Sequence, residues 1–91
     1  MAGDFMLGQV VVSIAGRDKG NYYIVVGFGD EPYLYLADGV KRKIEKGKKK
    51  NSKHVRPLPH VVEDINIKCQ AGMRVNNLEV AKALDNILGK I

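Results

Sequence analysis

Basic side chains crowd into one stretch of this 91-residue chain. Between Lys41 and Arg56 there are nine basic residues and a single acid, Glu45, so this stretch carries a formal charge of +8 while the rest carries −3. A focused positive patch raises the local concentration of polyanions and speeds their association. A loop kept charged only for solubility is the alternative, but solubility is served better by interspersed charges of both signs. The pattern therefore favours a polyanion site.

The chain contains residue types that bind metals or act in nucleophilic catalysis, but they lack the spacing that a metal site or a catalytic site needs. His54, His60 and Cys69 match no structural zinc pattern, and the chain has no second cysteine to pair with Cys69. Ser52 lies near His54 in sequence, but a catalytic triad assembles from distant segments and includes an orienting acid. We expect no metal site and no catalytic residue.

Glycines and carboxylates also fail to complete a known constellation. Gly27-x-Gly29 follows a strand pattern, but Pro32 and a second strand pattern come next instead of the helix of a dinucleotide site. The carboxylate pairs at 30–31 and 63–64 are sequence neighbours, whereas glycosidase chemistry needs an opposed pair across a cleft. We expect no cofactor.

Composition predicts a single folded domain. The chain is 45% hydrophobic and 27% charged, and its one cysteine excludes an internal disulfide. Six aromatic residues and no Trp leave little material for a large enclosed pocket. The first residues, MAGDFMLG, contain an acid and no basic region, and no apolar run approaches about 18 residues. We expect a cytoplasmic monomer that does not associate with membranes.

The first half of the chain has the pattern of antiparallel strands. Residues alternate or are β-branched and aromatic in three runs, and turn residues separate these runs. A strong two-residue hairpin signal, Asp38-Gly39, is followed by weak alternation in 40–45 and by a lysine loop over 47–53. The predicted strands are Gln9–Ile14, Tyr22–Val26 and Tyr33–Ala37.

The alternation assigns the residues of each strand to one of its two faces. Val10, Val12 and Ile14 fall on one face of the first strand, and the second strand is apolar on both faces, so something should cover each side. In the third strand, Leu34 and Leu36 should point inward. Tyr33 and Tyr35 should point outward, where they provide a seat for the last helix. We expect the four tyrosines of the chain to pack in the core or under a helix in preference to stacking on bases.

The pattern changes after Pro57. Together with Pro59, this residue should end any continuing strand. Residues 61–70 fit either a helix or a strand, and we favour a helix. Residues 77–88 have clear helical spacing. Asn76 lies three residues before Glu79, as in a capping box at the start of a helix, and Gly89 follows.

Residues 8–27, GQVVVSIAGRDKGNYYIVVG, resemble a KOW motif. They contain an opening Gly, alternating β-branched residues, a Gly–basic–x–basic–Gly turn at Gly16–Gly20 and a second hydrophobic strand. The continuation through YLYLADG at 33–39 and KKNSKHV at 49–55 is similar to the KOW-containing large-subunit ribosomal proteins of archaea and eukaryotes. It is closer to their small bacterial relatives, the KOW-domain RNA-binding proteins. Asn21 departs from the pattern, since many such motifs carry another basic residue there.

The resemblance implies a mainly β fold, a small SH3-like antiparallel β-barrel with C-terminal helical elements. The barrel would span residues 1–58, including a basic loop at 41–56, and residues 59–91 would form a helical extension packed on it within one compact domain. It also implies binding to RNA, in particular rRNA on a ribosome. The composition of the lysine loop suggests that it is not ordered before RNA binds.

The charge map and the resemblance together predict a non-catalytic phosphate clamp with little sequence specificity. Its residues are Arg17 and Lys19 in the first turn and, in the second basic element, Lys41, Arg42, Lys43, Lys48, Lys49, Lys50, Lys53, His54 and Arg56. The rival hypothesis is a protein-interaction KOW module of a transcription or translation factor. Such a module would dock through helix 77–88, using Leu84, Leu88 and Ile91.

Overall fold

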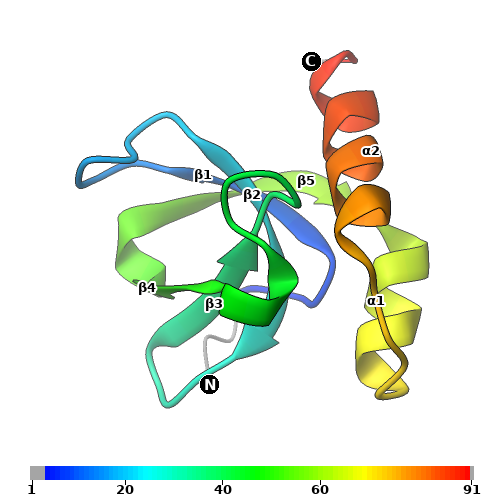
Figure 1. Ribbon diagram of the computed structural model, residues 1–91. Coiled ribbons are helices and arrows are strands. Elements are labelled where there is room, and N and C mark those ends of the chain that lie inside the picture. Colours follow the sequence, from blue (N-terminus) through cyan, green and yellow to red (C-terminus); the bar gives the residue numbers. More distant parts are fainter. Residues whose placement is uncertain (1–3, 91) are drawn as a thin grey trace.

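A computed structural model describes residues 4–90 and shows, within them, five strands and two C-terminal α-helices (Figure 1). The mainly β class and the helical end of the chain are thus confirmed. The elements are β1 (Gln9–Ser13), β2 (Tyr22–Phe28), β3 (Tyr33–Ala37), the 3-10 turn η1 (Ile44–Lys46), β4 (Lys48–Asn51), the 3-10 turn η2 (Ser52–His54), β5 (Val55–Val61), α1 (Glu63–Gln70) and α2 (Asn77–Leu88).

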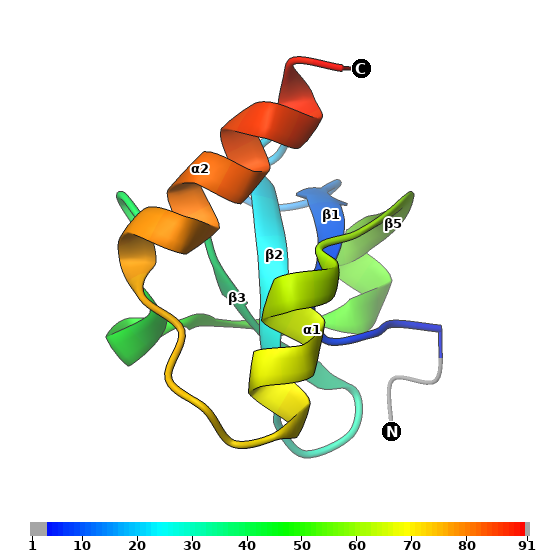
Figure 2. The same cartoon turned by 90° about the vertical axis from the view of Figure 1, so that its right-hand side faces the viewer.

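The strands form one antiparallel sheet in the order β4-β3-β2-β1-β5. In the described part of the chain, the edge strands β4 and β5 do not pair with each other, so the sheet is not closed. The single turn η2 joins the two edge strands directly. The strands curl, and both helices lie against one side of the sheet (Figure 2).

Strand β5 runs through both prolines, so the prediction that Pro57 and Pro59 end the strand is wrong. Strand β5 is an edge strand that pairs with β1 alone, and an edge tolerates residues that lack an N–H. The register shifts between Gln9 and Val11, opposite the proline-containing part of β5.

The lysine loop is also a strand. Lys48 and Lys50 pair with Leu36 and Leu34 as part of β4, which corrects the expectation of an unordered segment. Lysines are common on edge strands because their charge opposes pairing with another chain. The predicted two-residue hairpin at Asp38-Gly39 is wrong as well, because a longer connection over residues 38–47 joins β3 to β4.

Two hydrophobic clusters cover both faces of the central strands, as the pattern of β2 predicts. One cluster fills the inside of the curled sheet, and the other lies between the sheet and the helices. Val10 and Val11 are both fully buried, whereas Val12 is half-buried and Ile14 is exposed. The two faces of β1 therefore pack against different clusters, Val11 in the first and Val10 in the second.

Helix α2 covers only one end of the tyrosine face. Tyr33 and Tyr35 point outward as predicted, but only Ala37, further along the same strand, packs under α2. The first turn of α2 is anchored instead on the connection after β3. Ile44 N donates to Asn77 Oδ1 at 2.8 Å, and Gly39, with φ of 81°, lies so close to α2 that a side chain would collide with the Asn77 carbonyl. Helix α2 therefore packs on the Ala37 end of this face, and the prediction that Tyr33 and Tyr35 provide its seat is wrong.

Candidate nucleic-acid interface

An inward-facing acid organises the turn between β1 and β2. The Asp18 carboxylate accepts hydrogen bonds from Ser13 Oγ and Tyr23 OH, each at 2.9 Å. It also forms ion pairs with Lys50 Nζ at 2.6 Å and with Lys48 Nζ at 3.0 Å. This one side chain therefore ties the β1–β2 turn to the edge strand β4.

Burial alone would raise the pKa of Asp18. The hydrogen bonds from Lys50, Lys48, Ser13 and Tyr23 outweigh that effect and hold the pKa well below its usual range. Asp18 therefore stays ionised at neutral pH and keeps its cationic partners.

Two of the predicted phosphate ligands, Lys48 and Lys50, form ion pairs with Asp18. The Lys50 side chain is only 9% exposed, and its Nζ also donates to Ala15 O at 2.9 Å. Lys48 is half-buried beside it. The structure thus places Lys50 among the groups that hold the turn together, away from any solvent-borne phosphate.

The basic neighbours on either side of Asp18 lie on the outside of the turn. Arg17 and Lys19 are exposed. The Ile14 N–H donates to the His54 carbonyl at 2.9 Å, so the β1–β2 turn and η2 are adjacent, as Figure 1 shows at the left of the molecule. Basic residues from the turn, η2 and the start of β5 come together there. We call this group the cationic end: Arg17, Lys19, Lys53, His54 and Arg56.

The other predicted cations lie in a different part of the fold. Lys41, Arg42 and Lys43 are exposed on the connection between β3 and β4, which precedes β4, whereas η2 follows it. The Asp38 carboxylate shapes this connection by accepting the N–H groups of Val40 and Arg42, each at 2.8 Å. The basic stretch is therefore divided into two groups by strand β4.

Lys49 lies apart from both groups. Alternation along β4 turns it away from Lys48 and Lys50, and its Nζ lies 4.8 Å from the centroid of the Tyr33 ring. A cation over an aromatic face is attracted by the negative potential of the ring. The sequence offered no direct signal for this contact or for the role of Asp18, apart from the position of that acid inside a basic turn.

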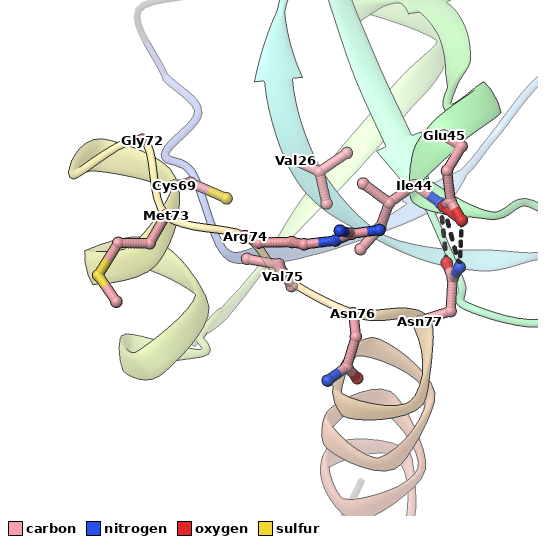
Figure 3. A pocket seen from close by; sticks show the side chains of 10 residues that line it. All are labelled: Val26, Ile44, Glu45, Cys69, Gly72, Met73, Arg74, Val75, Asn76 and Asn77. Carbon is pink, nitrogen blue, oxygen red and sulfur yellow. Dashed lines mark hydrogen bonds between the residues drawn. The ribbon is translucent and has the colours of Figure 1, made fainter.

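A hollow of about 540 Å³ lies between the α1–α2 connection and η1 (Figure 3). Burial raises the pKa of the Cys69 thiol in its wall, and both oxygens of Glu45 accept hydrogen bonds from Asn77 Nδ2, at 2.8 and 3.0 Å. The hollow is lined by Val26, Ile44, Glu45, Cys69, Gly72, Met73, Arg74, Val75, Asn76 and Asn77.

Over residues 4–90, the structure contains no group of three or more His, Cys, Asp or Glu side chains that could hold a metal ion. Across the same residues, no helix has the length and apolar character needed to span a bilayer.

The residues suggested for a protein-docking helix face largely inward. Leu84 is buried and Leu88 is partly buried, and both pack in the cluster between the sheet and the helices. Ile91 lies outside the described residues. Leu78 is the residue of α2 that presents a large apolar side chain to solvent, at 64% exposure.

Comparisons with known proteins identify no family for this chain. The KOW resemblance therefore remains a prediction from the sequence. No protein-family model matches the chain, and no curated protein matches it.

Proposed function

We propose that this protein binds RNA without catalysis, through exposed cations that contact phosphates with little sequence specificity. One observation carries the proposal: two segments distant in sequence, the β1–β2 turn and η2 with the start of β5, meet at the cationic end, which Asp18 helps to hold in place. In the described part of the chain, no ion pair engages Arg17, Lys19 or Lys53. These cations are therefore free to bind a polyanion.

RNA suits this surface better than a generic acidic partner. An RNA duplex presents phosphates and 2′-hydroxyls across a wide, shallow minor groove, which a basic turn crosses without reading bases. Arginines fork onto a phosphate with two hydrogen bonds, and lysines act as point charges. The sequence resemblance to KOW-domain RNA-binding proteins favours the same partner.

The proposal includes a KOW-type, SH3-like barrel and the ribosome as the source of the RNA. The barrel is supported by the curled antiparallel sheet, whose two edge strands are joined by the single turn η2. The ribosomal part is tested by sedimenting the tagged protein with ribosomes from its own cell extract at low and high salt. Co-sedimentation that is lost as salt rises supports it, and failure to co-sediment at either salt removes the ribosome from the proposal.

The phosphate clamp is tested by two triple variants, each of which removes one arginine and two lysines. Arg17→Ala/Lys19→Ala/Lys53→Ala strips the cationic end, and a control variant removes exposed cations elsewhere: Arg74→Ala/Lys82→Ala/Lys90→Ala. Affinity for a labelled RNA hairpin is measured by fluorescence anisotropy over a series of KCl concentrations.

Each lost phosphate contact reduces the slope of log K against log salt by about 0.7 to 0.9. The slope of the first variant should therefore be less steep by about 2, and the variant should bind about a hundredfold more weakly at 0.1 M salt. The control should keep both the slope and the affinity. Equal effects of the two variants would contradict the assignment of the site.

A further inference from the structure

Tyr35 presents an aromatic ring on the sheet face that α2 leaves uncovered. Its ring lies close to two glycines, Gly27 in β2 and Gly29 just after it. A Cβ placed on Gly29 would lie 3.1 Å from Tyr35 Cε2, and one on Gly27 would lie 3.7 Å from Cδ2. Because neither glycine has a side chain, the Cδ2–Cε2 edge of the ring can approach their backbone closely. Tyr35 is nevertheless 37% exposed, so part of the side chain is accessible to a ligand.

A shallow hollow of about 340 Å³ borders this ring, between β2 and η1. Its volume falls at the lower end of the range for small-ligand sites. The one carboxylate in its wall, Glu45, is held by Asn77 at the start of α2, where the positive end of the helix dipole lies (Figure 3). The hollow is lined by Val26, Gly27, Tyr35, Ile44, Glu45, Lys46 and Gly47.

Cations lie around the ring. Lys49 is directly opposite Tyr35 in the β3–β4 register, with its Nζ over Tyr33, and the exposed Lys46 lines the hollow. Tyr33 is paired with Asn51, the last residue before η2, so the face continues from Tyr35 past Tyr33 to the cationic end. Aromatic rings beside positive charge, along one continuous path, match the chemistry of an unpaired nucleic-acid strand.

We propose that an unpaired RNA base stacks on the exposed ring of Tyr35, while Lys46 and Lys49 bind the flanking phosphates. This inference rests on the proposed function and deepens it, because it names RNA with single-stranded loops or ends as the preferred partner. Bases within a duplex are already stacked on one another and cannot reach the ring, whereas unpaired bases stack readily on aromatic side chains.

The test compares a 12-nucleotide single-stranded RNA with the blunt duplex of the same sequence, by fluorescence anisotropy at fixed salt. Tyr35→Ala should weaken binding of the single strand about tenfold, leave the salt slope unchanged and leave duplex binding unchanged. Tyr35→Phe keeps the ring and should stay within about twofold of the original protein. Phe28→Ala is the matched control, because Phe28 is a 39% exposed aromatic that borders a different hollow.

The stacking proposal is overturned if Tyr35→Ala leaves single-strand affinity unchanged, or if it weakens the single strand and the duplex equally. Retained duplex binding also shows that the variant is folded. A failure of the proposed function gives a different result: the original protein then binds neither RNA in a salt-dependent way. Salt-dependent binding of both RNAs that is insensitive to Tyr35 removes the stacking site alone.

Discussion

Replacing Asp18 with Asn should remove a large share of the protein's stability, because it leaves the Lys50 ammonium buried without a counter-charge. Asp18 and Lys50 are 8% and 9% exposed, and their charged atoms lie 2.6 Å apart. Removing one partner of a buried pair costs about 3 to 5 kcal/mol. We expect about 3 kcal/mol, the lower end, because Lys50 Nζ keeps its hydrogen bond to Ala15 O.

This destabilisation is large compared with the protein's whole free energy of unfolding. A chain of this length has a free energy of unfolding of about 5 to 14 kcal/mol, at about 0.05 to 0.15 kcal/mol per residue. The expected fall in Tm is about 12 to 24 °C. Urea unfolding followed by circular dichroism measures the free energy, and Asp30→Asn, at an exposed acid in the β2–β3 loop, is the control.

A second substitution separates loss of the charge from loss of the side chain. Adding Lys50→Met to Asp18→Asn removes the uncompensated charge, so the double variant should be more stable than the sum of the two single effects predicts. The reasoning is refuted if the free energies of unfolding of Asp18→Asn and Asp30→Asn differ by less than about 1 kcal/mol, because breaking a buried ion pair costs more than that.

The pH dependence of stability provides an independent check. The pKa of Asp18 is lowered on folding, so its contribution is fully present above its unfolded value of about 3.8 and is lost as pH falls below it. The original protein should therefore lose stability steeply below about pH 4, and Asp18→Asn should give a flatter profile there. Parallel profiles would contradict the ionised state of Asp18.

Three further outcomes follow from single sites. Asn76→Ala removes the N-cap of α2 and should cost about 1 kcal/mol in urea unfolding, and no loss would contradict the capping box. Gly39→Ala should lower Tm far more than Gly20→Ala, since both glycines have positive φ but only Gly39 would collide with α2; equal losses would contradict that packing. Cys69 should react with a thiol reagent at pH 7.5 much more slowly than free cysteine and speed up on unfolding, because burial raises the pKa of its thiol; a fast native reaction would contradict this.

Local signals in the sequence predict most of the central elements. The alternation of Leu34 and Leu36 with the tyrosines and the capping box before α2 depend on neighbouring residues, and both are confirmed. The strand through Pro57 and the ordered lysines of β4 were missed because both depend on an edge position, which the order of strands in the sheet determines.

The candidate site was only partly predictable for a related reason. Its exposed basic residues are visible in the composition, but their division into two groups depends on the tertiary path of the chain. Lys50 bonds to an acid 32 positions away, so the sequence alone could not distinguish it from its exposed neighbour Lys49. Likewise, the placement of α2 left Tyr35 uncovered, although its outward orientation was predicted.

The most direct test of RNA binding is a titration of the original protein with a labelled RNA hairpin at KCl concentrations from about 50 to 300 mM. The exposed cations of the cationic end, Arg17, Lys19, Lys53 and Arg56, predict a straight line of log K against log salt with a slope of about −3 or steeper. Absence of binding at the lowest salt, or an affinity that does not change with salt, would contradict the account.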